Sequence, residues 1–516
     1  MKIFDIVRDH EVLTLDGCIL RGDLYRPSTT SPVPCVIYRT PYGKEKLWNE
    51  IFGPNDCLEA GFAAYVQDLR GFYRSDGLPN VTNWEQENED SYATIEALSK
   101  EDWCDKQFCL AGSSFPGIVA LSSLNKRHPN LKAIAPSMVS LEPFESELTK
   151  PLIRFEEIVV WIAHMTVLKA RRACGSDIDA LNPSVKALGA SLMDIRKLFE
   201  EIDRTGIPEV LLDLEGETLL RFLDSGTSPF PSLELETLSK IPSIFVTGWY
   251  DTFANTTVEI FDAIKTYRGD HESSLFVGPW SHSNQLATNV GQINFGPRGT
   301  GAAMGIPNKH AQFLRKLFAG ESVKASPVSE FELFNNNWSI EPGSGVRKIA
   351  LKSVGTAAEI QLMAEATFTP TWGGQTHFTA GEVPGPIDQR PLLHRSDVAL
   401  LESETFEEDT TVAGEVLVHY EAKDDVSHFV FAKLALVDRW GQILPIQEAV
   451  FPAGGLAQGS FPRTRFRVSA GEKLAIIFSL DCYPRYFHPG MLKDRDAVRL
   501  RKVDIGGVVD LRLPVV

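Results

Sequence analysis

Long hydrophobic runs are absent from this 516-residue chain. No apolar stretch reaches a length of about 18 residues, which a membrane-spanning helix needs. The start, MKIFDIVRDHEV, carries charge where a signal peptide would have its apolar region. Basic residues are also outnumbered, and the formal net charge is −17. Because an acidic surface repels phosphates, nucleic acid and anionic membranes are disfavoured as partners. The sequence therefore predicts a cytoplasmic protein.

Cysteine is sparse, and the seven residues form no CxxC pair; they stand at positions 18, 35, 57, 104, 109, 174 and 482. Reduced thiols explain this odd, scattered set most simply. The eleven histidines show neither an HExxH motif nor His–Cys spacing, so we expect no metal and no other cofactor.

The periodicity of the chain changes after residues 143, 238 and 325, and because the second α/β segment continues the first, this predicts three parts. Strands alternating with helices indicate a parallel α/β sheet formed by residues 1–143 and 239–325. Residues 144–238 are helix-periodic without strand signals, as expected of an inserted helical cap. Short strand-like runs separated by turns fill residues 326–516 and predict a β-sandwich.

Three polar residues each follow an apolar, strand-like run: Ser114 in AGSSFPG, Asp251 in GWYDTF and His282 in GPWSHSN. A serine hydroxyl needs an imidazole to take its proton and a carboxylate to orient that imidazole. The order Ser, Asp, His is that of α/β-hydrolases. Taken singly, each residue is more often an ordinary turn, cap or surface residue; together they predict a serine hydrolase.

A strand-to-helix elbow is predicted around Ser114, with KQFCLAG as the strand and IVALSSLN as the helix. Gly112 and Gly117 flank the serine where a side chain would collide with neighbouring backbone. The spacing is GxSxxG instead of GxSxG, and Pro116 is acceptable in the first helical turn.

These motifs resemble the cocaine esterase and X-Pro dipeptidyl-peptidase family of α/β-hydrolases. The resemblance covers nearly the whole chain, because it continues in VIYRTPYGK (36–44), AAYVQDLRGFYRSDG (63–77) and PGPIDQRP (384–391). It implies that Ser114 is the nucleophile, His282 the base and Asp251 its orienting partner. It also implies that the sandwich is a jelly roll, which we expect to pack on the catalytic domain and to close one wall of the site.

The same resemblance implies an oxyanion hole made by the Tyr42 hydroxyl and the backbone N–H of Phe115. Without the resemblance, Tyr42 is more simply a turn residue between Pro41 and Gly43. Phe115 replaces the tyrosine usual after the nucleophile. We interpret Asp68 and Arg70 as a buried structural ion pair or a loop clamp.

An aromatic acyl pocket over Ser114 is predicted from Phe253, Trp161, Trp249 and Trp280. For Trp249 and Trp280, a supporting role in the core is about equally compatible with the sequence.

We therefore expect hydrolysis of a small-molecule carboxylic ester or amide through an acyl-enzyme intermediate. An X-Pro-type peptidase or amidase stays open, as does a biosynthetic acyltransferase, lyase or cyclase using the same triad. A glutaryl-cephalosporin acylase or α-amino-acid ester hydrolase activity is disfavoured, because those relatives need charged groups for a charged substrate and the sequence identifies none. The expected partner is the small substrate, and a homodimer is compatible with the sequence.

Overall fold

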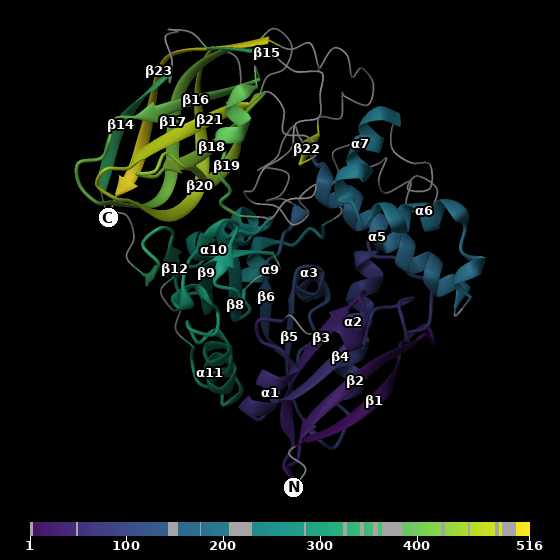
Figure 1. The fold of residues 1–516 in the computed structure, drawn as a ribbon. Helices are drawn as coiled ribbons and strands as arrows, with labels where there is room; N and C mark the ends of the chain where they lie inside the picture. Colours follow the sequence, from purple (N-terminus) through teal and green to yellow (C-terminus); the bar gives the residue numbers. More distant parts are fainter. Residues whose placement is uncertain are drawn as a thin grey trace.

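The computed structural model describes residues 4–47, 50–142, 153–175, 177–205, 230–282, 285–323, 328–340, 345–353, 360–363, 385–395, 397–424, 429–452, 455–479, 485–487 and 502–515. These residues form a catalytic α/β domain, a group of cap helices and a carboxyl-terminal β domain (Figure 1). No helix among them is both long and apolar enough to span a bilayer.

A ten-stranded mixed sheet forms the catalytic domain. Its strand order is β1-β2-β4-β3-β5-β6-β8-β9-β12-β13, and the pairs from β4 to β12 are parallel. The strands are β1 (Phe4–Leu13), β2 (Ile19–Pro27), β3 (Val33–Thr40), β4 (Ala63–Asp68), β5 (Cys104–Ser113), β6 (Leu131–Ser137), β8 (Ser243–Tyr250), β9 (Ser273–Ser281), β12 (Ser329–Glu332) and β13 (Asn337–Ser339).

Helices cover this sheet, and they are α1 (Pro54–Ala60), α2 (Trp84–Leu98), α3 (Phe115–Ser122), α9 (Leu235–Ser239), α10 (Ala254–Tyr267) and α11 (Ile306–Phe318). Every residue of β4, β8 and β9 is buried, as expected for parallel strands covered on both faces. The predicted α/β-hydrolase core is therefore confirmed. The predicted domain boundary at residue 325 comes too early, because β12 pairs with β9 and brings β13 into the catalytic sheet.

The cap consists of β7 (Ile153–Arg154), α5 (Phe155–Cys174), α6 (Pro183–Ser191) and α7 (Ile195–Thr205). The three helices lie together in Figure 1. Within the helix-periodic region, residues 184–202 form parts of two helices, because Asp194 interrupts the run. Its carboxylate accepts the Lys197 amide at 3.2 Å, which is the bond of a helix N-cap. Apolar side chains of the three helices, including Val159, Leu188 and Phe199, pack on one another. Residues 144–152, 176 and 206–229 of the predicted cap lie outside the described residues.

The carboxyl-terminal domain is an antiparallel β-sandwich, as predicted. Nine of its strands run in the order β19-β18-β21-β16-β14-β23-β17-β20, with β15 paired to β23. The strands are β14 (Gly345–Ser353), β15 (Ile360–Met363), β16 (Val398–Ser403), β17 (Thr410–Asp424), β18 (Phe429–Val437), β19 (Ile443–Pro452), β20 (Gly455–Val468), β21 (Lys473–Ser479) and β23 (Lys502–Val515). A separate short strand, β22 (Tyr486–Phe487), pairs with β7 of the cap.

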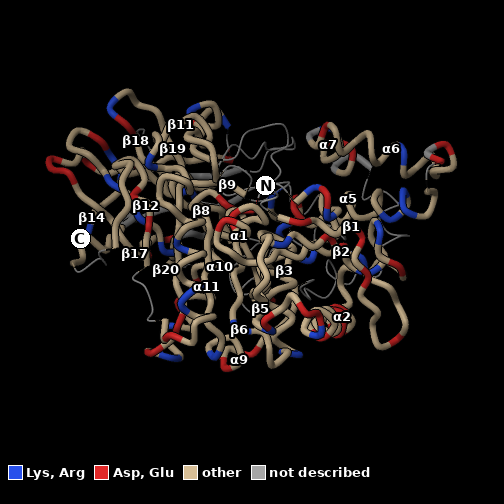
Figure 2. The backbone as a smooth tube through the Cα atoms, turned by 90° about the horizontal axis from the view of Figure 1, so that it is seen from below, with Lys and Arg blue, Asp and Glu red and all other residues tan. Residues whose placement is uncertain are grey.

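The sandwich and the catalytic domain share one continuous hydrophobic core. Leu333, just after β12, donates its amide to the Arg465 carbonyl at 3.1 Å and accepts from the Arg467 amide at 3.0 Å. Arg463 of β20 adds ion pairs to Asp262 on α10 and to Glu330 on β12. Figure 2, which shows the backbone from below, has acidic and basic residues interspersed along the chain.

Candidate active site

Ser114 lies between the end of β5 and the first residue of α3, at the predicted strand-to-helix elbow. Its backbone has φ 62° and ψ −131°, a strained conformation for a residue with a side chain, and its amide is fixed by the Ser137 carbonyl at 2.9 Å. A Cβ on Gly112 would lie 2.4 Å from Pro116 Cβ, and one on Gly117 would lie 2.5 Å from the Gly112 oxygen. Both glycines of the GxSxxG spacing are therefore required by close backbone approach.

Asp251 and His282 lie after β8 and β9, two neighbouring parallel strands, so their side chains meet at one edge of the sheet. The Nδ1 atom of His282 is 2.5 Å from Asp251 Oδ1. Thr247 donates its hydroxyl to the other carboxylate oxygen at 3.1 Å. Asp251 is fully buried and can orient the imidazole through this contact. Because Nδ1 is engaged by the carboxylate, Nε2 is the ring nitrogen that can accept a proton from a hydroxyl.

Ser114 and His282 line the same cavity, which has a volume of about 450 Å³. Tyr42, Phe115, Trp161 and Phe253 line it as well. A cavity of this size fits a small substrate. The described lining residues come from the catalytic domain and the cap, so the expectation that the sandwich closes one wall finds no support among them.

Tyr42 follows β3 and presents its hydroxyl toward the cap. The indole N–H of Trp161 donates to this hydroxyl oxygen at 3.2 Å, which leaves the phenolic proton to be donated elsewhere. Burial raises the pKa of Tyr42 to about 12, with the Trp161 hydrogen bond opposing the rise, so the phenol stays protonated near neutral pH. The Phe115 amide is at the first position of α3, where a helix makes no internal bond to its N–H.

Asp68 holds the Tyr42 loop in place. Its carboxylate accepts the backbone amides of Lys44, at 2.6 Å, and Arg74, at 3.1 Å. Asp68 is therefore a loop clamp, whereas the alternative of an ion pair with Arg70 is wrong, because Arg70 pairs with Asp16 and Asp90.

A model of the X-Pro dipeptidyl-peptidase (S15 family) matches residues 16–284, just over half of the chain. The chain belongs to the X-Pro dipeptidyl-peptidase (S15) family. It is thus a serine hydrolase with the α/β-hydrolase fold, as the sequence motifs implied.

Other proteins are similar to this chain over most of its length. The chain is 26% identical to cocaine esterase of Rhodococcus sp. (strain MB1 Bresler), over 92% of this chain and 87% of the esterase. An aminopeptidase from a marine sediment Thaumarchaeota archaeon superposes with a TM-score of 0.76 at 16% identity, covering 100% of this chain and 97% of that one. An α-amino acid ester hydrolase superposes with a TM-score of 0.72 at 17% identity, again covering 100% of this chain and 97% of that one.

Within this cavity, an aromatic stack supports the strand-to-helix elbow at Ser114. The Phe115 ring lies between Trp84 of α2, with ring centroids 5.4 Å apart, and Trp161 of α5, at 5.5 Å. Phe115 thus joins the elbow to the cap through its side chain, in addition to offering its backbone N–H.

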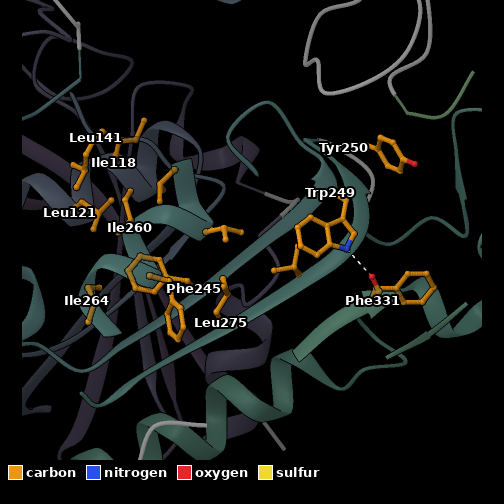
Figure 3. Packing of buried hydrophobic residues seen from close by; sticks show 14 of the residues in the cluster. Ile118, Leu121, Leu141, Phe245, Trp249, Tyr250, Ile260, Ile264, Leu275 and Phe331 are labelled. Carbon is orange, nitrogen blue, oxygen red and sulfur yellow. Dashed lines mark hydrogen bonds between the residues drawn. The ribbon is translucent and has the colours of Figure 1, made fainter. Parts of the chain in front are cut away.

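Phe253, also predicted for the pocket, lines the S15 cavity with its ring edge-on to the His282 imidazole, at a centroid distance of 5.7 Å. Trp249 and Trp280 do not line it. Both are fully buried in the core, where the Trp249 indole donates to the Phe331 carbonyl at 2.8 Å (Figure 3) and the Trp280 indole to the Gly299 carbonyl at 2.6 Å. Their predicted pocket role is corrected to support of the loops that carry Asp251 and His282.

Sequence reasoning missed the charged residues that line this S15 cavity: Lys46, Glu50, Arg154 and Glu157. They lie in two short segments that are far apart in the chain, and only the second segment carried a signal, because Glu157 lies with Glu156 in the first turn of a helix. The sequence identified no charged groups for a charged substrate, whereas the structure places these four at the cavity.

Proposed function

We propose that the protein hydrolyses small carboxylic esters by transferring the acyl group to Ser114 and then to water. The observation that carries the proposal is the shared cavity lined by Ser114, Tyr42 and His282, with His282 held by Asp251 at 2.5 Å. Similarity to cocaine esterase supports the choice of an ester.

In the acylation step, the Ser114 oxygen bonds to the ester carbonyl carbon while its proton passes to His282 Nε2. The negative charge that develops on the carbonyl oxygen is met by the Tyr42 hydroxyl and the Phe115 N–H. The bond to the alcohol oxygen then breaks, and His282 returns the proton to that leaving oxygen. Phe253 and Trp161 contact the acyl group in this proposal.

Water completes the cycle. Its oxygen bonds to the acyl carbon while one of its protons passes to His282, and the bond to Ser114 then breaks. The proton on His282 returns to the serine oxygen, and the carboxylic acid leaves. No step of this sequence calls for a metal, and the described residues contain no group of three or more metal-ligating side chains.

Amide hydrolysis is the second candidate, because the family is described as an X-Pro dipeptidyl-peptidase. Cleavage of a proline-linked chromogenic amide, compared with an ester of the same acyl group, separates the two candidates.

Ser114→Ala tests the proposal. We expect a loss of ester turnover of roughly 10³-fold or more, because only binding and the oxyanion hole remain. Fluorophosphonate labelling followed by peptide mapping should place the adduct on Ser114, and the neighbouring variant Ser113→Ala should still be labelled there. More than about a tenth of the wild-type rate in Ser114→Ala would assign the nucleophile elsewhere.

A further inference from the structure

The loop that carries Asp251 is held from outside the catalytic sheet. Just before Asp251, the Tyr250 hydroxyl donates to the Pro445 carbonyl of β19 at 3.0 Å. Just after the loop, the Asn255 side-chain oxygen accepts the side-chain amide of Gln447, also on β19, at 3.1 Å. The sandwich therefore holds the loop at both of its ends, although none of its described residues lines the cavity.

Arg154 of the cap holds the middle of the same loop. Its guanidinium donates to the backbone carbonyl of Thr252, the residue after Asp251, and to the Thr252 hydroxyl oxygen at 3.0 Å. The Thr252 hydroxyl donates in turn to Glu157, whose carboxylate lies 3.9 Å from the guanidinium. All three side chains are buried. Because a guanidinium is never deprotonated in proteins, these donors are present at any working pH.

The sandwich also fixes the backbone from which Arg154 extends. Strand β7, which contains Arg154, pairs with β22, and Tyr486 lies opposite Arg154 in that pair. The Tyr486 ring stacks on Phe431 of β18 with centroids 5.6 Å apart. The preceding residue, Arg485, forms a buried ion pair with Glu448 of β19. The contact between Arg154 and Thr252 is thus anchored on the carboxyl-terminal domain.

We infer that Arg154 is a positioning residue, which together with the sandwich fixes the Asp251 loop so that the carboxylate meets His282 in the orientation that proton transfer needs. Arg154 takes no part in the hydrolytic steps themselves. This inference rests on the proposed function, and it gives the cap and the sandwich a part in the chemical step.

A displacement of Thr252 would disturb the base from two directions. Asp251 precedes it and lies 2.5 Å from His282 Nδ1, whereas Phe253 follows it with its ring edge-on to the same imidazole. Misplacing a reacting group by about 1 Å can cost roughly 10²-fold in rate. Because such an error changes the alignment of the base and not the affinity for the substrate, it should lower kcat and leave KM nearly unchanged.

Arg154→Met tests the inference, because methionine is also a long, unbranched side chain but has no hydrogen-bond donor. With p-nitrophenyl acetate as substrate, we expect kcat to fall roughly tenfold to a hundredfold while KM changes by less than about twofold. Fluorophosphonate should also label Ser114 at least roughly tenfold more slowly, because labelling needs the same aligned base.

Arg172→Met is the matched control. Arg172, on α5, also donates to a backbone carbonyl of the catalytic domain, that of Ser75, at 2.7 Å, but it does not line the cavity. Both rates should stay within about twofold of the wild type. Losses of similar size in the two variants would attribute the effect to a general loosening of the cap and overturn the inference. A rise in KM at unchanged kcat in Arg154→Met would overturn it as well, because Arg154 would then be a substrate contact.

A second pair of variants decides if Arg154→Met does not fold, since removing a charge from beside buried Glu157 costs stability. Thr252→Val and Thr252→Ser both keep the two charges. Valine lacks the hydroxyl that links Arg154 to Glu157, whereas serine retains it. We expect kcat to fall at least roughly threefold in the valine variant and to stay within about twofold of the wild type in the serine variant. Equal kcat in the two variants would overturn the inference.

The two readouts separate this inference from the proposed function. If p-nitrophenyl acetate is hydrolysed through Ser114 but Arg154→Met matches the wild type in both rates, only the positioning role fails. If the wild type hydrolyses no ester, but labelling of Ser114 is slowed in Arg154→Met and not in Arg172→Met, only the proposed ester hydrolysis fails.

Discussion

Tyr42→Phe is expected to lower kcat by roughly 10²-fold or more while leaving KM nearly unchanged. Removing one donor of an oxyanion hole typically raises the activation free energy by about 2.7–4 kcal/mol, which corresponds to a loss of this size. The substitution deletes only the hydroxyl, so the ring keeps its contact with His164, at a centroid distance of 6.4 Å. The loop also keeps the clamp provided by Asp68. The effect should therefore be confined to the transition state.

Trp161→Phe tests the same hydroxyl from the other side. A phenylalanine can still stack on Phe115 but cannot donate to Tyr42. A neutral hydrogen bond contributes about 0.5–1.5 kcal/mol, so we expect kcat/KM to fall roughly twofold to tenfold.

The double variant shows whether the two residues act together. If the Trp161 indole works through the Tyr42 hydroxyl, then Trp161→Phe should cost little more once Tyr42 is phenylalanine. Steady-state kinetics on p-nitrophenyl acetate for the wild type, the two single variants and the double variant gives the coupling free energy between the two residues. A rise in KM at constant kcat in Tyr42→Phe would move this residue to ordinary substrate binding, and strictly additive losses would separate Trp161 from it.

Three further outcomes are expected. Phe253→Ala should penalise a small aryl ester and spare or favour a larger acyl ester, and equal losses of kcat/KM on both would place Phe253 in the structural core. Trp249→Ala should destabilise the protein by about 3–5 kcal/mol in urea unfolding without changing ester preference, and a changed preference would return this indole to the pocket. For Glu50, the folded-state pKa of about 7 lies above its ordinary value of 4.5. The unfolded chain therefore loses its proton first, and stability should fall as pH rises through this window, by up to about 3 kcal/mol. Glu50→Gln should lose less stability than the wild type between pH 5 and pH 8 in urea unfolding, and parallel losses would contradict the shift.

The parts of the site that could be predicted from the sequence are those in which one short segment determines the structure. The elbow is such a case, because Gly112 and Gly117 act on backbone within five residues of Ser114. Asp251 and His282 were predictable because each follows an apolar strand, and neighbouring parallel strands bring their ends together.

The residues that line the cavity were harder to predict from the sequence, because the lining depends on which face of a loop or helix turns inward. Trp249 and Asp251 are two residues apart, yet the indole turns into the core toward Phe331 while the carboxylate turns toward His282. Glu50 belongs to a loop without periodicity, so no pattern marks its place in the cavity lining.

The shared core beneath Leu333 has a genetic consequence. All the proposed catalytic residues are encoded before position 285, so a premature stop codon in the last third of the gene would leave each of them translated. The catalytic sheet would nevertheless lose the strand that bonds to Leu333 and the partners of Asp262 and Glu330. Apolar surface normally covered by the sandwich would face water. Such alleles should behave as complete losses of function, and the two domains should be inherited as a single unit.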